Sequence, residues 1–288
     1  MKLADKWKDY ELIDCSNGEK LERWGNVYLL RPDPQVIWNN GVLRNKYNNI
    51  NSHYHRSNKG GGSWENLKKT PEAWKINYGD LTFNIKQMGF KHTGLFPEQA
   101  VNWDFMMDKI KKSNKEIKVL NLFAYTGGAS VACLKAGASV VHVDSSKGMV
   151  EWAKENVKAS NLEDRPVRFL IDDVVKFVKR EIRRGNKYDA IIMDPPSYGK
   201  GANGEVWDIE KDLYPLVMLC KEILVDNPLF FIINTYTTGL SSEVFKNILK
   251  ILFEGDNGKI ISEEIAIPIG KGNLVLPCGI TSRYESNE

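Results

Sequence analysis

The sequence predicts an α/β protein with two parts. We expect a doubly wound, mostly parallel sheet over residues 96–288 and a smaller β-rich domain over residues 1–95. From Gln99 onward, short apolar stretches alternate with longer helical ones, which is typical of a parallel sheet covered by helices on both faces. The last two apolar stretches have no helix between them, so we expect an antiparallel hairpin at the C-terminal end of the sheet.

Turn residues divide the first 95 residues into short strands. Asn17-Gly18 predicts a tight hairpin, because both residue types accept the positive φ angles of a type I′ turn. Residues 27–30 are apolar and strand-like, and residues 57–63, rich in glycine, predict a mobile loop tip. Residues 76–86 alternate apolar and polar side chains after a Gly-Asp turn, which predicts a second hairpin.

Strand–helix units follow in the second part of the chain. Pro97 suits the start of a helix, and Gly137 and Gly185 suit helix C-termini because glycine readily adopts the left-handed conformation. We expect strands at residues 117–123, 139–143, 167–171, 188–193 and 229–234, helices at 98–112, 128–136, 146–160, 174–184, 208–224 and 241–253, and a closing pair of strands at 259–268 and 274–284.

The composition is that of an ordinary globular protein, with 42% hydrophobic and 27% charged residues. Residues 1–14 lack the apolar core of a signal peptide, and no apolar run approaches the roughly 18 residues of a membrane span. The cysteines are scattered, and His53, His55, His92 and His142 show no ligand spacing with carboxylates or cysteines. We therefore expect a cytoplasmic protein without a disulfide framework, a metal site or a membrane segment.

The net charge of +3 conceals an uneven distribution. Residues 1–95 carry 15 Lys and Arg against 10 Asp and Glu, whereas the remainder carries 25 against 27. Between Arg44 and Lys91 there are 9 basic and 3 acidic residues, interleaved with aromatic ones. Basic and aromatic side chains together suit a nucleic acid, which offers phosphates and stackable bases. A solvated basic face with its aromatic residues in the core explains the pattern equally well.

The first candidate binding loop leaves the strand expected at 117–123 and turns into a helix. Gly127 and Gly128 allow close backbone approach, and the helix N-terminus offers N–H groups to a carboxylate or phosphate. A nicotinamide dinucleotide is disfavoured, because the G-x-G-x-x-G spacing is absent. A tight turn without a ligand is the simpler alternative. The candidate ligand-binding residues of this loop are Phe123, Ala124, Tyr125, Thr126, Gly127 and Gly128.

Acidic residues end the next two expected strands. Asp144, with Ser145 beside it, can accept hydrogen bonds from both hydroxyls of a ribose. Asp172 and Asp173 follow the third strand, where a carboxylate can cap the helix that begins at Val174. Because the carboxyl ends of parallel strands meet at one edge of a sheet, these residues suit a nucleoside-bearing ligand there.

The segment Asp194-Pro195-Pro196-Ser197-Tyr198 ends the fourth expected strand. The two prolines stiffen the loop and remove backbone donors, so that carbonyl oxygens and the Asp194 carboxylate can hold an amino group. Tyr198 can stack on a planar base, and Gly199-Lys200-Gly201 predicts a flexible basic loop suited to phosphate. A proline-rich turn with a tyrosine packed into the core is the alternative.

From Phe83 to Tyr284 these motifs resemble the class I S-adenosylmethionine-dependent methyltransferases. The segment Asp194–Tyr198 is similar to the Asp/Asn-Pro-Pro-aromatic motif of members that methylate nucleobase or amide nitrogens. The segment Gly89–Gln99 is similar to one in the bacterial 23S ribosomal RNA methyltransferases that modify cytosine C5 or guanine N7, although His92 is an insertion-like departure. The resemblance implies a Rossmann-like fold and S-adenosylmethionine as the cofactor.

Several residue roles are implied by the resemblance alone. An acidic residue after the third strand would accept from the adenine amino group, and alignment at the strand end favours Asp173 over Asp172. The segment similar to Gly89–Gln99 lies over the cofactor in the family, which makes Lys91, Thr93, Gly94, Phe96 and Gln99 cofactor-site candidates. The catalytic candidates are Asp194, Pro195, Pro196 and Tyr198, and Asp194 is also expected to border the cofactor.

A cysteine decides between two chemistries. Methylation of cytosine C5 requires a thiolate that adds to C6, and in the C5-modifying relatives this cysteine follows the fifth strand. Here residues 234–239 contain no cysteine, and Cys133 and Cys220 lie in expected helices as packing residues. Methylation of a nitrogen is therefore favoured, and a C5 reaction that uses Cys278 is the alternative.

The sequence thus predicts an S-adenosylmethionine-dependent methyltransferase that N-methylates a base in ribosomal RNA, with the N-terminal domain positioning the acceptor. The choice of ribosomal RNA rests on analogy. A small-molecule or protein methyltransferase would make the basic segment incidental. An NAD-dependent oxidoreductase would leave Asp194-Pro-Pro unexplained, and an inactive RNA-binding module would have no use for the cofactor loop.

Overall fold

The computed structural model describes residues 1–58, 60–201, 204–236 and 239–287. The contacts between Cα atoms divide the described chain into two compact units. The first, which we call the α/β unit, contains Val101–Ile265 and the C-terminal segment from Gly279 onward. The second, which we call the β unit, contains Lys2–Ala100 and Ala266–Cys278. The division at residue 95 into two domains with separate roles stays a prediction.

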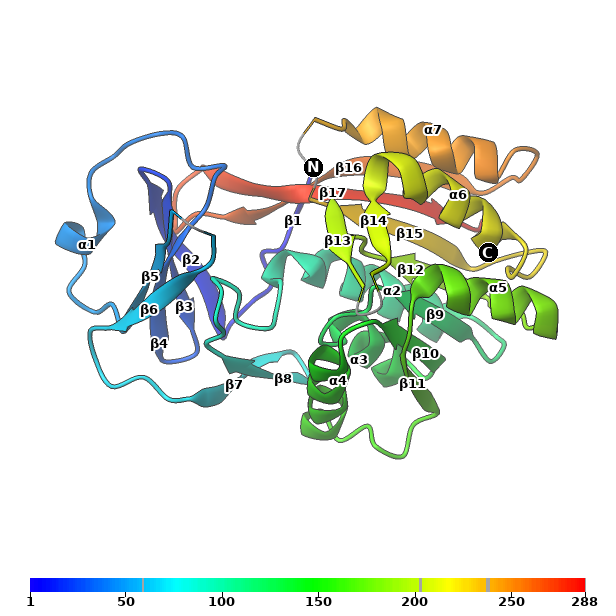
Figure 1. Cartoon of the computed structure of the whole chain (residues 1–288), viewed down its shortest axis with the longest axis horizontal. Coiled ribbons are helices and arrows are strands. Elements are labelled where there is room, and N and C mark those ends of the chain that lie inside the picture. Colours follow the sequence, from blue (N-terminus) through cyan, green and yellow to red (C-terminus); the bar gives the residue numbers. More distant parts are fainter. Residues whose placement is uncertain (59, 202–203, 237–238, 288) are drawn as a thin grey trace. The chain divides into compact units, whose positions relative to one another are not determined.

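A mainly parallel sheet forms the centre of the α/β unit (Figure 1). Its neighbouring strands follow the order β16-β17-β15-β12-β9-β10-β11, and β9 to β12 and β15 pair in parallel. At the C-terminal end β17 pairs antiparallel with β15, and the short loop from β16 makes the closing hairpin. The expected doubly wound sheet is thus confirmed. The strands are β9 (Lys118–Leu122), β10 (Ser139–Asp144), β11 (Val167–Ile171), β12 (Ala190–Met193), β15 (Phe230–Thr235), β16 (Lys259–Pro268) and β17 (Val275–Glu285).

Helices cover both faces of this sheet (Figure 1). One face carries α2 (Ala100–Lys112), α3 (Gly128–Lys135) and α4 (Lys147–Ala159), and a 3₁₀ turn at Pro97–Gln99 precedes α2. The other face carries α5 (Val174–Arg184), α6 (Ile209–Lys221) and α7 (Ser242–Leu252). Because both faces are covered, the central parallel strands are largely apolar, and the sequence of β12 (Ala-Ile-Ile-Met) is wholly so.

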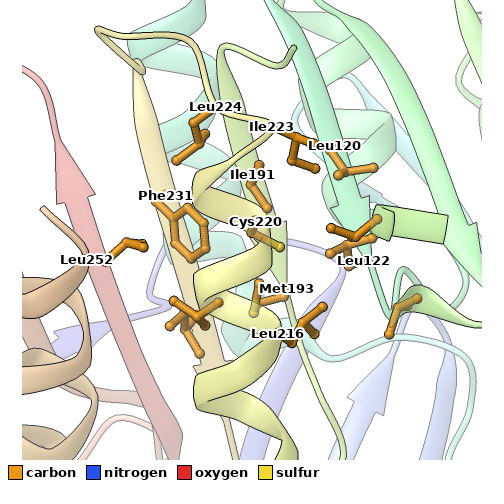
Figure 2. Close-up of a cluster of buried hydrophobic side chains, with 14 of the residues drawn as sticks. Leu120, Leu122, Ile191, Met193, Leu216, Cys220, Ile223, Leu224, Phe231 and Leu252 are labelled. Atoms are coloured by element: carbon orange, nitrogen blue, oxygen red, sulfur yellow. The ribbon is translucent and has the colours of Figure 1, made fainter. Parts of the chain in front are cut away.

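The core beneath α6 shows this directly (Figure 2). Leu120, Ile191 and Phe231 come from three adjacent strands and are fully buried against the helix. Cys220 of α6 lies among them with no exposed surface, so the expectation that it is a packing residue is confirmed.

The β unit contains a second sheet in the order β2-β3-β4-β5-β6 and a separate β7–β8 pair. The turn at Asn17 and Gly18 has φ angles of 52° and 78°, so the first predicted hairpin is confirmed. The second predicted hairpin is β7–β8, and Lys59 of the expected loop tip lies outside the described residues. The elements are β1 (Lys2–Leu3), β2 (Tyr10–Ser16), β3 (Glu19–Trp24), β4 (Val27–Pro32), α1 (Leu43–Lys46), β5 (Ser52–Arg56), β6 (Gly62–Asn66), β7 (Ala73–Tyr78) and β8 (Leu81–Lys86).

One element of the α/β unit differs from expectation. Residues 199–201 were expected to be a flexible basic loop, but β13 (Tyr198–Lys200) pairs antiparallel with β14 (Val206–Asp208). Three-residue strands are too short to show an alternating pattern in the sequence, and tertiary contacts of Trp207 stabilise the hairpin. No helix within the described residues is long and apolar enough to cross a membrane.

Candidate active site

The candidate loops of the α/β unit meet at the carboxyl edge of its sheet. Leu122 of β9 lies beside Val143 of β10 and Met193 of β12, so the loops after these strands leave the sheet side by side. Backbone bonds continue the pairing beyond the strands: the amide of Ala124 donates to the Val143 carbonyl at 3.1 Å, and that of Asp194 to the Leu122 carbonyl at 3.4 Å. This edge is where doubly wound sheets bind ligands.

The loop between β9 and α3 is held in an uncommon conformation. Phe123 and Tyr125 have φ angles of 52° and 51°, which non-glycine residues rarely adopt. Gly127 has a φ angle of 81° and stands immediately before α3. A Cβ atom on Gly127 would lie 2.9 Å from the Ala153 Cβ, and one on Gly128 would lie 2.8 Å from the Trp103 ring. Packing against α2 and α4 therefore requires glycine at these two positions, whether or not a ligand also requires it.

Asp144 connects this loop to the next one. One carboxylate oxygen accepts from the Tyr125 amide at 2.8 Å and the other from the Ser146 amide at 2.9 Å. Burial raises the pKa of Asp144 above its usual value, although these two amide bonds favour the charged form. Each oxygen has a second lone pair, which a ribose hydroxyl could use. Ser145, next to Asp144, is exposed.

A buried polar network supports the loop from below. The Asn121 amide group donates to the Ser130 hydroxyl at 2.9 Å, and that hydroxyl lies 3.0 Å from Nδ1 of His142. Asn156 of α4 donates to the Thr126 carbonyl at 2.8 Å. Burial lowers the pKa of His142 to about 3, so the ring is neutral. The side chains of this network were not predicted from the sequence, although Asn121 and His142 were visible as polar interruptions in apolar strands.

Both carboxylates after β11 have partners. The Asp173 side chain accepts from the Lys176 amide at 2.8 Å and caps α5, as the sequence allowed. Asp172 forms an ion pair with Arg180 of the same helix. A role for either residue in holding adenine stays a prediction.

The loop after β12 presents its tyrosine to solvent. The Tyr198 side chain is 58% exposed, so the alternative of a core-packed tyrosine is wrong. Pro195 is buried, whereas Pro196 is exposed and its carbonyl accepts from the Trp207 indole at 2.7 Å. Asp194 stands beside the cofactor-loop candidates in the register of the sheet. These features leave the Tyr198 ring available to a planar acceptor.

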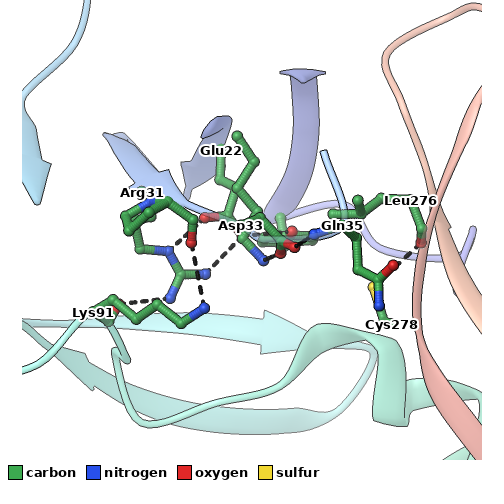
Figure 3. Close-up of polar contacts among 10 residues, drawn as sticks. Glu22, Arg31, Asp33, Gln35, Lys91, Leu276 and Cys278 are labelled. Carbon is green, nitrogen blue, oxygen red and sulfur yellow. Dashed lines mark hydrogen bonds and ion pairs between the residues drawn. The ribbon is translucent and has the colours of Figure 1, made fainter. Parts of the chain in front are cut away.

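The remaining cofactor candidates belong to the β unit. Lys91 donates to the Pro32 carbonyl at 3.3 Å, and its own carbonyl accepts from Arg31 at 2.9 Å (Figure 3). Burial, and then Lys20 and Arg31, lower the pKa of Lys91 to about 8. Thr93 is fully buried, and its hydroxyl has no hydrogen-bond partner in the described structure. Gly94 has a φ angle of 94°, and the Phe96 ring contacts the His92 ring. Gln99 is buried.

Cys278 also belongs to the β unit (Figure 3). Its thiol donates to the Leu276 carbonyl at 3.3 Å. Burial, and then the charge of Glu98, raise the pKa of Cys278 well above its usual value. A thiol held in this form is a poor nucleophile. In the segment 234–239, Thr237 and Thr238 lie outside the described residues.

The basic segment from Arg44 to Lys91 keeps exposed cations but few accessible rings. Arg56, Lys68, Lys69 and Lys75 are exposed. In contrast, most aromatic residues of the segment are buried (Tyr54, Tyr78 and Phe83) or half-buried (Tyr47, Trp64 and Trp74), whereas Phe90 is 53% exposed. The expectation that these aromatic side chains offer stacking surfaces is wrong for the buried ones, because their rings are packed inside the unit. The cations remain available to phosphates.

Two histidines of the β unit lie close together, which sequence analysis missed. His53 and His55 share a face of β5, and Glu65 lies opposite His53 on β6. Each of the three side chains offers one potential metal-ligand atom, and these atoms all lie within 4.8 Å of one another. The Arg44 guanidinium donates to both carboxylate oxygens of Glu65, at 2.6 and 2.9 Å. Nε2 of His53 lies 2.5 Å from a carboxylate oxygen of Glu19. The hydrogen bonds from Arg44 and then His55 lower the pKa of Glu65 to about 2. The cluster is accounted for as an ion-pair network.

Comparisons with known proteins agree with this arrangement. The family model described as S-adenosylmethionine-dependent methyltransferase matches residues 45–239. The crystal structure of the SAM-dependent methyltransferase from Agrobacterium tumefaciens is 34% identical, covers 99% of this chain and 93% of that one, and has a TM-score of 0.93.

Curated relatives share part of the chain. The ribosomal RNA large subunit methyltransferase K/L of Syntrophotalea carbinolica is 29% identical over 63% of this chain and 25% of its own length. The protein of the same name from Shewanella woodyi is 31% identical over 77% of this chain and 30% of its own length. The chain thus spans about a quarter to a third of these relatives. It belongs to the family of S-adenosylmethionine-dependent methyltransferases, and is an enzyme whose cofactor is S-adenosylmethionine.

Proposed function

We propose that this enzyme methylates a nitrogen atom of a base in ribosomal RNA. The observation that carries the proposal is the loop Asp194–Tyr198, which stands beside the cofactor loop and presents an exposed aromatic ring. The similarity to proteins named ribosomal RNA large subunit methyltransferases supports RNA as the acceptor. We place the activity in the cytoplasm, where ribosomal RNA is found.

The cofactor would be held by main-chain and carboxylate groups at the edge of the sheet. S-Adenosylmethionine, when bound, supplies a methyl group on a positively charged sulfur that is already a good leaving group. The amides near Gly127 and Gly128 would donate to its carboxylate, and Asp144 would accept from its ribose. Lys91, Thr93, Gly94, Phe96 and Gln99 remain proposed cofactor residues on the strength of the sequence similarity.

The acceptor would be held by the loop after β12. The Asp194 carboxylate would accept a hydrogen bond from an amino group, while Tyr198 stacks on the base. This contact would aim the nitrogen lone pair along the line of the bond that breaks. Most of the acceleration would come from this alignment, and Asp194 could accept the nitrogen proton after transfer.

The phosphates of the RNA would meet the exposed cations of the β unit. Arg56, Lys68, Lys69 and Lys75 are exposed and carry no ion pair within the described residues. Their charges would contribute an affinity that does not depend on sequence and falls with added salt.

A nucleoside comparison tests the acceptor. Ribosomal RNA from cells with and without the gene would be digested and analysed by mass spectrometry, and deproteinised RNA from the deletion strain would then be incubated with the enzyme and S-adenosylmethionine. We expect one methylated nucleoside to disappear in the deletion strain and to reappear in the incubation. Unchanged nucleosides and no incorporation would overturn RNA as the acceptor.

A second experiment distinguishes nitrogen from carbon methylation. RNA that contains 5-fluorocytosine traps C5 methyltransferases as stable covalent adducts, because the fluorine blocks release of the thiolate. We expect no adduct with this enzyme. An adduct that disappears in Cys278→Ser would show that the chemistry is C5 methylation.

A further inference from the structure

We propose that Trp207 is a positioning residue that holds the acceptor loop against the cofactor loop during methyl transfer. The inference rests on the proposed role of Asp194–Tyr198 in binding the acceptor. It adds a residue that lies outside both loops, on the hairpin β13–β14.

Trp207 contacts both loops at once. Its indole N–H donates to the Pro196 carbonyl at 2.7 Å, inside the acceptor loop. Its ring packs on Phe123, the first residue of the cofactor loop, with 4.9 Å between ring centroids and 59° between planes. Phe123 and Asp194 follow paired positions of neighbouring strands, so Trp207 spans the two loops at the point where they leave the sheet.

Each contact of Trp207 restrains a part of a loop that main-chain hydrogen bonds alone do not restrain. Phe123 adopts a φ angle of 52°, which costs energy unless surrounding contacts favour it, and the indole ring supplies such a contact. The two prolines have no N–H group with which to anchor the loop, so anchoring depends on a donor elsewhere that bonds one of the loop's carbonyls. The indole provides that donor and thereby orients the peptide that follows Pro196.

The hairpin that carries Trp207 is itself anchored on both sides. Gly199 pairs with Trp207 across the strands, and the Ile209 amide donates to the Ser197 carbonyl at 3.1 Å. Glu205 accepts from Lys176 at 2.5 Å, in the first turn of α5. The indole is therefore held in place by main-chain bonds and an ion pair, as a residue that orients others must be.

The experiment compares three variants of the full-length enzyme. Trp207→Phe keeps a ring but removes the N–H donor, Trp207→Ala removes both, and Val206→Ala changes a neighbouring side chain that is 57% exposed. Methyl transfer to deproteinised ribosomal RNA gives kcat and KM, calorimetry with S-adenosylhomocysteine gives cofactor affinity, and hydrogen exchange reports on amides 197–200.

We expect Trp207→Phe to lower kcat about ten- to hundredfold, because small displacements of aligned groups have effects of that size. Cofactor affinity should change by no more than a few-fold, and amides 197–200 should exchange faster. Trp207→Ala should lower kcat further, and Val206→Ala should resemble the wild type in every measurement.

Several outcomes would overturn the inference. Unchanged hydrogen exchange at 197–200 in Trp207→Phe would show that the indole does not hold the acceptor loop. Faster exchange with an unchanged kcat would show that holding it does not matter for transfer. If the wild-type enzyme leaves ribosomal RNA unmethylated, the proposed function fails, whereas the exchange rates in Trp207→Phe still decide whether the indole positions the loop.

Discussion

Two carboxylates, one in each unit of the molecule, are treated in opposite ways. In the β unit, Glu22 has no exposed surface and accepts two bonds from Arg31, at 2.6 and 2.7 Å, with a third from the Tyr10 hydroxyl at 2.8 Å (Figure 3). In the α/β unit, Asp144 stands at the carboxyl edge of the sheet with two amide partners and spare lone pairs. The first carboxylate is saturated by the protein, and the second retains capacity for a ligand.

This difference appears in the pKa values. Burial alone would raise the pKa of Glu22, but Arg31, Lys20 and the Tyr10 hydroxyl lower it to about 2. Burial raises the pKa of Asp144, and its amide bonds do not compensate. A buried carboxylate whose charge is fully matched serves the fold, whereas one left partly unmatched is suited to bind.

The largest expected effect comes from breaking the saturated pair. Glu22→Ala leaves the Arg31 charge buried without its carboxylate partner, which should lower the free energy of unfolding by about 3–5 kcal/mol. Urea denaturation measures it. The matched control is Glu65→Ala, whose partner Arg44 is exposed and can hydrate, so little change is expected. Equal effects in the two variants would remove the distinction between the buried and the exposed pair.

The same pair has a pH signature. Because the folded-state pKa of Glu22 lies below the ordinary value, its contribution to stability is complete above pH about 4.5 and is lost as pH falls toward about 2. Stability measured across this range should fall less steeply in Glu22→Gln than in the wild type.

The second prediction concerns the acceptor loop. Asp194→Ala should reduce turnover at least about hundredfold, or about 3 kcal/mol of transition-state stabilisation, because it removes the group that aligns the nitrogen. Cofactor affinity, measured by calorimetry with S-adenosylhomocysteine, should stay within a few-fold of the wild type. Lost binding with normal turnover at saturation would assign Asp194 to the cofactor instead.

The third prediction concerns Asp144. Asp144→Ala should weaken S-adenosylmethionine binding by about 1–3 kcal/mol for each hydrogen bond to the charged group that is lost. In the wild type, affinity should fall as pH drops through the raised pKa of Asp144, at a higher pH than for an ordinary aspartate, because the protonated acid accepts fewer bonds. Calorimetry against pH tests both statements, and unchanged affinity in the variant would remove Asp144 from the ribose.

The smallest expected effect concerns the exposed cations of the β unit. Lys68→Ala should weaken RNA binding modestly and reduce the slope of log affinity against log salt by about 0.7 for a single-stranded phosphate contact. Filter binding at several salt concentrations measures the slope, and Lys112→Ala, an exposed lysine on α2, serves as the control. A flat salt response of the wild type would favour a small-molecule or protein acceptor.

Much of the α/β unit could be predicted because its signals are local. Apolar strands such as 117–123, the capping glycine Gly185 and the turn at Asn17-Gly18 each encode their conformation within a few residues. The loops that carry Asp144 and Asp194 could be placed for the same reason, since each follows a recognisable strand.

The unpredicted features depend on residues far apart in the chain. Strands β13 and β14 are too short for periodicity, and the contacts of Trp207 with Phe123 and Pro196 exist only after three segments have come together. The aromatic residues between Arg44 and Lys91 looked available to bases, yet Tyr54, Tyr78 and Phe83 are buried, because a small unit needs large apolar side chains to bury enough surface.

The sequence by itself determined the order of strands and helices, the glycines at Gly127 and Gly128, and the acidic and proline residues that follow the strands. It did so because hydrophobic period, turn chemistry and motif spacing are local properties. Only the tertiary structure decided which carboxylates were saturated and which kept free lone pairs. It also decided that Cys278 is held as a thiol and that an indole spans two loops, because burial and partners depend on the whole packed chain.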